Sequence, residues 1–108
     1  MSELNGQATP EQIAQWKEDI QKKYGENAKV FEYSVEDKVC YIRTVDRATY
    51  SAAAAKVSTS PAKFTDIILQ NCWLGGCEII RKEDQYYFGL SEFLEELIAK
   101  KKGSLREV

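Results

Sequence analysis

The fold is decided by one stretch, Asn71-Cys72-Trp73-Leu74-Gly75-Gly76-Cys77. An apolar helical pattern runs into it from Pro61 to Leu74, and the two glycines that follow free the backbone for a left-handed turn. The sequence before this stretch is typical of a small mixed domain. The sequence after it has the pattern of one long amphipathic helix.

Upstream of this stretch, the sequence predicts a helix followed by a β-hairpin. The helix begins after Thr9, where a capping residue precedes a proline, and ends at Gly25. Residues 29–35 alternate apolar and polar side chains, and residues 38–43 are rich in β-formers. The short polar break between them predicts a hairpin. Because a lone hairpin is marginal in water, it needs other elements against one face.

An alanine-rich helix is predicted next, from Arg47 to about Val57. Asp46 can cap it, and its middle is the run 52–55 of four alanines. Tyr50 is its only large aromatic side chain. A face of small residues permits close approach by another helix, so it indicates either tight internal packing or a docking surface that would include Tyr50.

The last third of the chain predicts a short apolar segment at 77–80, either a third strand or a packed link, and then a helix from about Asp84 to Gly103. The sequence therefore predicts one α+β domain over residues 9–108. It comprises an N-terminal helix, a β-hairpin, two short helices and a longer C-terminal helix. Residues 1–8 are polar and are expected to be a flexible N-terminus.

Composition excludes several classes of protein. The 108 residues suffice for one domain, and 15 basic against 17 acidic side chains give a net charge of −2. A nearly neutral chain argues against nucleic-acid binding, which normally needs a basic surface. No segment is apolar enough to suggest a membrane span or a signal peptide, and three cysteines fit reduced thiols. We expect a cytoplasmic protein.

The absence of histidine restricts the available chemistry. It removes serine–histidine and cysteine–histidine nucleophiles and the histidine-based zinc motifs. Cys72 and Cys77 lack the spacing of a redox motif, although the glycines between them leave a thiol redox pair as an alternative. Gly75-Gly76 lacks the remaining residues of a phosphate-binding loop. We therefore expect no catalytic residue, no cofactor and no metal from these motifs, and any enzyme would have to work with carboxylates, lysines, tyrosines or thiols.

Arg43 and Arg47 bracket the passage from the hairpin to the alanine-rich helix. Two guanidinium groups so placed can clamp a carboxylate, a loop or a partner. The alternative is an ordinary ion pair with Asp46 or Glu32.

Aromatic side chains supply the other candidates for partner contacts. The predicted C-terminal helix carries Tyr87 and Phe88 beside further large groups, more than one buried stripe requires. Trp73 lies in the last turn of the preceding predicted helix. Aromatic residues left partly outside a core suit protein–protein contacts. Trp73, Tyr87 and Phe88 are therefore predicted, with Arg43, Arg47 and Tyr50, as partner-binding residues.

The order of these motifs resembles a known family. It comprises a hairpin leading into Arg43-Thr44-Val45-Asp46-Arg47, an alanine-rich helix, a Ser-Pro helix start, Cys72-Trp73-Leu74-Gly75-Gly76 and an acidic C-terminal helix. Over about residues 28–100 this resembles the small tail assembly chaperones of tailed bacteriophages and prophages. Val45 and Asp46 depart from it, because family members often have a proline between the two arginines.

The resemblance implies a non-enzymatic function. Such chaperones coat the long helical tape measure protein before the tail tube polymerises around it, which implies a protein partner and self-association. The alternative is a generic cytoplasmic interaction or adaptor module, with the alanine-rich and final helices forming a partner groove. A small thiol redox protein is the third possibility.

Overall fold

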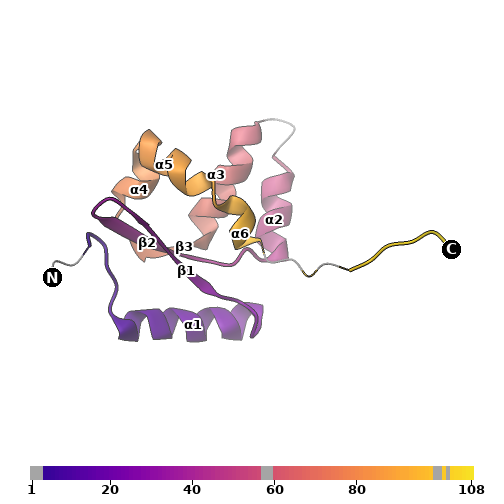
Figure 1. Ribbon diagram of the computed structural model, residues 1–108, viewed down its shortest axis with the longest axis horizontal. Coiled ribbons are helices and arrows are strands. Elements are labelled where there is room, and N and C mark those ends of the chain that lie inside the picture. The colour runs from indigo at the N-terminus through magenta and orange to yellow at the C-terminus, as the bar shows by residue number, and fades with distance from the viewer. Residues whose placement is uncertain (1–3, 57–59, 99–100, 102) are drawn as a thin grey trace.

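The computed structural model describes residues 4–56, 60–98, 101 and 103–108. Within these residues the chain forms helices that pack on a three-stranded sheet (Figure 1). The elements in chain order are α1 (Pro10–Tyr24), β1 (Val30–Val35), β2 (Lys38–Arg43), α2 (Arg47–Ala54), α3 (Pro61–Cys72), β3 (Trp73–Gly76), α4 (Ile79–Lys82), α5 (Asp84–Ser91) and α6 (Leu94–Leu97). The predicted α+β class is confirmed.

The sheet is antiparallel, with the strands in the order β1-β2-β3. β1 and β2 form the predicted hairpin, in which Phe31 pairs with Ile42 and Val35 with Lys38. Glu36 and Asp37 make the turn, and Glu36 takes a positive φ of 55°. β2 is the central strand, and β1 is left at an edge.

Helices cover both faces of the sheet. Figure 1 shows α1 on one side and the remaining helices on the other. On the α1 side, the rings of Trp16 and Tyr41 have centroids 5.3 Å apart. On the opposite side, Cys40 and Ile42 of β2 enter the main core. The fully or nearly fully buried members of this core are Cys40, Ile42, Ala53, Ile68, Leu69, Cys72, Ile80, Leu90 and Leu97.

Most of the predicted helix boundaries are found. The Thr9 hydroxyl accepts from the Gln12 N–H at 3.1 Å, and Gly25 caps the other end of α1. Asp46 caps α2 by accepting from the Thr49 N–H at 3.3 Å. α3 begins at Pro61 as predicted, although Ser60 makes no side-chain capping bond. α2 ends at Ala54, and the predicted end at Val57 lies outside the described residues.

The glycine stretch differs from its prediction. α3 ends at Cys72, and Trp73–Gly76 forms strand β3 instead of a helical turn followed by a loop. Of the two alternatives left open for residues 77–80, the third strand is not found, because α4 begins at Ile79. A Cβ on Gly76 would lie 2.4 Å from the Cys40 Cα, and Gly76 has a φ of +125°. Glycine therefore serves here for close pairing with β2.

The long C-terminal helix is a second wrong prediction. The structure has α5 ending at Ser91 and a separate short α6, and the longest helix is α1, with 15 residues. A straight helix would carry Leu97 about 10 Å beyond Leu90 along its axis. The break lets both leucines enter the core, and the Val45 N–H donates to the Leu97 carbonyl at 2.9 Å.

The N-terminal segment makes backbone contacts with the hairpin where it is described. Asn5 bridges to Lys38, its N–H donates to the Asp37 carbonyl at 2.7 Å, and its carbonyl accepts from the Val39 N–H at 2.9 Å. Gly6 packs so closely that a Cβ on it would lie 2.2 Å from the Cys77 nitrogen. The Ala8 N–H also donates to the Tyr41 hydroxyl at 3.3 Å, while residues 1–3 lie outside the described chain.

Candidate functional site

Arg43 lies inside the fold and is already bound there. Its side chain is 6% exposed and pairs with Asp46 at 2.9 Å, as one of the predicted alternatives had it. Its guanidinium also lies over the Tyr24 ring at 4.2 Å. Its further hydrogen bonds go to the carbonyl oxygens of Thr44 (3.0 Å) and Asn71 (3.2 Å) and to the Thr49 hydroxyl (3.4 Å). We call these six residues the Arg43 cluster.

The electrostatics of the Arg43 cluster are internally balanced. Burial opposes ionisation of Asp46, but hydrogen bonds from Thr49 and Arg43 outweigh it and hold the pKa of the carboxyl below its usual range. The ion pair joins the end of β2 to the cap of α2, and the hydrogen bond to the Asn71 carbonyl joins it to the end of α3. The Arg43 guanidinium therefore connects three elements inside the fold, whereas Arg47 is exposed.

Arg47 and Tyr50 lie on the surface of α2. Arg47 is exposed at the first position of the helix. Tyr50 is 43% exposed, and its ring meets Phe64 of α3 edge-on at 5.5 Å. On the same helix, Ala53 is fully buried, so the alanine-rich stretch uses one small residue for internal packing.

The three remaining predicted residues have different surroundings. Trp73 is half-buried in β3, with the Arg81 guanidinium 4.6 Å from its ring. Tyr87 is half-buried, and its hydroxyl donates to the Asp66 carboxylate. Phe88, which packs against Tyr87, is 63% exposed. The structure thus leaves Phe88 as the most available aromatic of the predicted set.

An apolar groove lies elsewhere, beside the edge strand. It has a cavity volume of about 510 Å³ and is framed by β1 and Ile42 on one side and by α5, Phe93 and α6 on the other. We call it the β1 groove. Its lining residues are Phe31, Glu32, Tyr33, Ser34, Val35, Ile42, Leu90, Phe93, Glu96 and Leu97.

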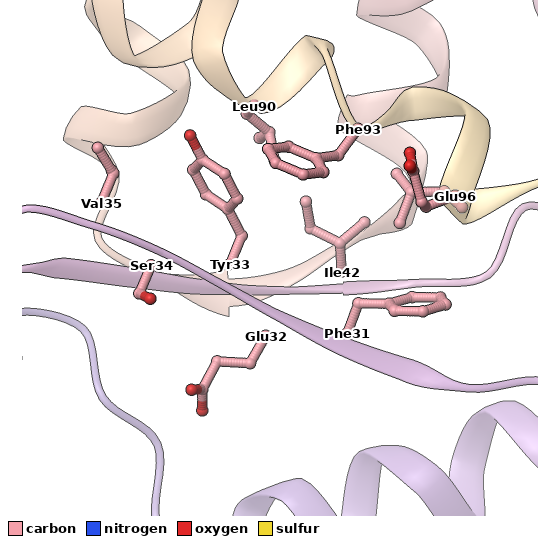
Figure 2. Close-up of a pocket in the computed structure, with 10 residues that line it drawn as sticks. Phe31, Glu32, Tyr33, Ser34, Val35, Ile42, Leu90, Phe93 and Glu96 are labelled. Atoms are coloured by element: carbon pink, nitrogen blue, oxygen red, sulfur yellow. The ribbon is translucent and has the colours of Figure 1, made fainter.

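Strand alternation gives the β1 groove its apolar floor. Figure 2 shows Phe31, Tyr33 and Ile42 turned toward the helices, whereas Glu32 points to the other side of the strand. Phe93 closes over the floor, with its ring centroid 5.6 Å from that of Tyr33, and yet is 48% exposed. The groove therefore presents apolar side chains to solvent in one continuous place.

The helical rim of the groove is acidic. Glu96 lies at the rim in Figure 2, and Glu92 is the residue just before Phe93. Burial chiefly raises the pKa of the Tyr33 hydroxyl, with smaller electrostatic contributions from Cys40 and Glu92. Neither glutamate forms an ion pair with another described residue. The rim therefore favours a positively charged group.

The backbone of β1 is open on its outer side. As an edge strand, it directs alternate N–H and C=O groups away from β2. Within the described chain, residues 30–35 make backbone hydrogen bonds only in the hairpin itself. An extended segment could therefore pair with β1 along the groove.

The wall formed by α5 is anchored to the hairpin turn. The Tyr86 hydroxyl donates to Glu36 at 2.7 Å, and the Lys38 ammonium lies 4.7 Å from the Tyr86 ring. Lys38 also pairs with Asp37 at 2.8 Å, and this bond chiefly raises its pKa. Because the wall is tied to the turn, the groove is preformed.

The thiols are poorly placed for chemistry. Burial raises the pKa of Cys40 to about 12 and that of Cys72 to about 11. Such thiols stay protonated at neutral pH and are weak nucleophiles. Cys77 is half-buried.

Among the residues that the structure describes, no three histidine, cysteine or acidic side chains are grouped so as to hold a metal ion. No helix among the described residues is long and apolar enough to cross a bilayer.

Sequence reasoning found the parts of the β1 groove but not the groove itself. The alternation of Phe31, Tyr33 and Val35 was visible, and Phe93 belongs to the predicted apolar stripe of the last helix. What the sequence did not show is the break after Ser91, which turns Phe93 toward the strand. A half-buried edge strand facing a broken helix is the signal that could have located it.

Comparison with known proteins gives no further assignment. The chain matches no protein-family model, no curated protein and no solved structure.

Proposed function

We propose that this chain is a non-enzymatic tail assembly chaperone whose β1 groove binds an amphipathic segment of a tape measure protein. The observation that carries the proposal is the preformed apolar groove with an unpaired acidic rim. The order of sequence motifs, which resembles that of phage tail assembly chaperones, supports the choice of partner.

The chemistry of the groove defines the segment that it would bind. Apolar side chains at helical spacing would enter between Tyr33 and Phe93. A lysine or arginine next to them would meet Glu96, which forms no ion pair with another described residue. A long helical partner offers this pattern repeatedly, so many copies of the chaperone could bind along it.

The test is coexpression with a tape measure protein encoded beside this chain. Size exclusion should show a complex with several chaperone copies per partner. Phe93→Ser should weaken binding about tenfold, because a partly exposed aromatic in a binding groove is a typical hot spot. Phe88→Ser is the matched control, since Phe88 is also exposed but lies outside the groove. Thermal unfolding should show that both variants fold.

Three outcomes would count against the proposal. The absence of any complex contradicts it directly. Loss of binding in Phe88→Ser but not in Phe93→Ser moves the binding site to the outer face of α5. A chain with no tail genes beside it, but with some other partner bound in the groove, favours the generic adaptor.

A further inference from the structure

The C-terminal segment 103–108 stands apart from the rest of the described chain. Figure 1 shows it running away from the helices. Leu105 and Val108 are fully exposed, at 101% and 106%, and a Cβ on Gly103 would meet nothing within 4 Å. Among the described residues, these two large apolar side chains therefore have no packing partner.

The groove and this segment match in length and backbone geometry. β1 has 6 residues with an open outer edge, and the segment from Gly103 to Val108 spans as many. The segment is extended rather than helical. An extended segment can add to an edge strand through main-chain hydrogen bonds, with alternate side chains on opposite faces.

Their charges match in one arrangement. If Arg106 and Val108 face the groove, the cation meets the rim carboxylate of Glu96 while the valine meets the apolar floor. The next residue, Glu107, then faces the other side of β1.

The other side of β1 also fits this arrangement. A hollow between α1 and β1 is lined by Lys17, Gln21, Ala28, Lys29 and Val30. Neither lysine forms an ion pair with another described residue. Glu107 would meet these ammonium groups, and Leu105 would lie on the same face near Val30. Both faces of the segment therefore find complementary chemistry at β1.

The segment is poorly placed to reach the groove of its own chain. It leaves the fold at α6, whose last residue, Leu97, lines the groove and is held by the Val45 N–H. Residues 103–108 run away from the helices that frame this groove (Figure 1). The groove of a second copy is therefore the acceptor that we consider.

We propose that residues 103–108 of one copy add as a strand to β1 of a second copy and occupy its groove until a partner displaces them. The inference rests on the proposed function, because it concerns the same groove. The donated segment and the accepting groove are different surfaces, so exchange closes a dimer if it is reciprocal and otherwise continues from copy to copy.

The first test compares the full chain with a chain ending at Lys102. Sedimentation equilibrium from micromolar to millimolar concentration should show association of the full chain and a monomeric truncated chain. The truncation removes no described contact, so folding should be unchanged by circular dichroism. A full chain that stays monomeric at millimolar concentration, or a truncated chain that associates equally, overturns the proposal.

The second test examines the charge pairing. Arg106→Glu and Glu96→Arg should each weaken association about tenfold, and the two together should restore it. Arg47→Glu, an exposed charge on α2, is the matched control and should leave association unchanged. If the combined variant is as weak as the single ones, the proposed arrangement is wrong.

Partner binding separates this inference from the proposed function. The truncated chain should bind the tape measure protein at least as tightly as the full chain, because its groove has no competing segment. Partner binding together with a monomeric full chain overturns only the inference. Tail-dependent association without any partner binding overturns only the chaperone function.

Discussion

The Arg43 cluster and the β1 groove differ in how completely their charged and aromatic side chains are bound within the fold. In the cluster, the Arg43 guanidinium has an ion pair, hydrogen bonds and an aromatic ring around it. In the groove, Phe93 packs on Tyr33 but stays 48% exposed, and Glu96 forms no ion pair with another described residue. The difference teaches that Arg43, which residue type makes easy to notice in the sequence, serves the fold. The exposed apolar surface is instead formed by residues of β1 and α5–α6 that no short motif marks.

The largest effect should come from breaking the Arg43 cluster. Arg43→Ala leaves Asp46, only 18% exposed, without its cation, and should lower the free energy of unfolding by about 3 kcal/mol. Arg47→Ala is the matched control, because this side chain is exposed, and should change it by less than about 0.5 kcal/mol. Urea unfolding of both variants measures this. Equal effects would mean that burial of Arg43 contributes nothing.

The next effect concerns the glycine that joins β3 to the sheet. Gly76→Ala places a Cβ 2.4 Å from the Cys40 Cα at a φ of +125°, so the strands must separate. We expect a loss of about 2 kcal/mol in thermal or urea unfolding. Gly103→Ala, where a Cβ meets nothing, should be neutral. A neutral Gly76→Ala would show that β3 pairs less closely than described.

The stretch around Gly76 also shows how far the sequence predicts the structure. The hairpin, the start of each of the first three helices and the α+β class follow from local signals that the structure keeps, such as Thr9 at the cap of α1. The stretch around Gly76 was predicted as a turn, because local propensity does not reveal that an edge of β2 is available for pairing. Tertiary pairing outweighed the local signal there.

The candidate site was less predictable than the fold, for the same reason. Arg43 was identified by residue type, yet its role depends on the carbonyl of Asn71, which is far away in sequence. The β1 groove depends on where the C-terminal helix breaks, and that break is set by burial of Leu90 and Leu97 rather than by a strong helix stop. Both features come from contacts between distant residues.

A smaller effect should appear at alkaline pH. Burial raises the pKa of Cys40 to about 12 in the fold, whereas an unfolded thiol ionises near pH 9. The unfolded state therefore loses a proton that the folded state keeps, so this contribution to stability is full below about pH 9 and declines as the pH rises toward 12. At pH 9.5 we expect a loss of about 1 kcal/mol relative to pH 7.

Cys40→Val isolates the contribution of this thiol. The variant has no titratable group at this position, so its urea midpoint should fall less between pH 7 and pH 9.5 than that of the parent chain. The comparison uses the pH dependence, because the substitution itself shifts stability at every pH. Identical pH dependence in the two chains would show that the Cys40 thiol reaches solvent.

The smallest expected change in the free energy of unfolding distinguishes Tyr87 from Phe88, for which the sequence predicted the same role. Tyr87 is half-buried, and its hydroxyl donates to Asp66, which ties α5 to α3, whereas Phe88 is 63% exposed. Tyr87→Phe removes only the hydroxyl and should cost about 1 kcal/mol in urea unfolding, the value of one hydrogen bond to a partly exposed carboxylate. Phe88→Ser should stay within about 0.5 kcal/mol of the parent chain.

Asp66→Asn combined with Tyr87→Phe should cost little more than either change alone, because both remove the same bond. Additive losses would mean that the two side chains act separately, and Tyr87 would then be as free for partner contacts as Phe88.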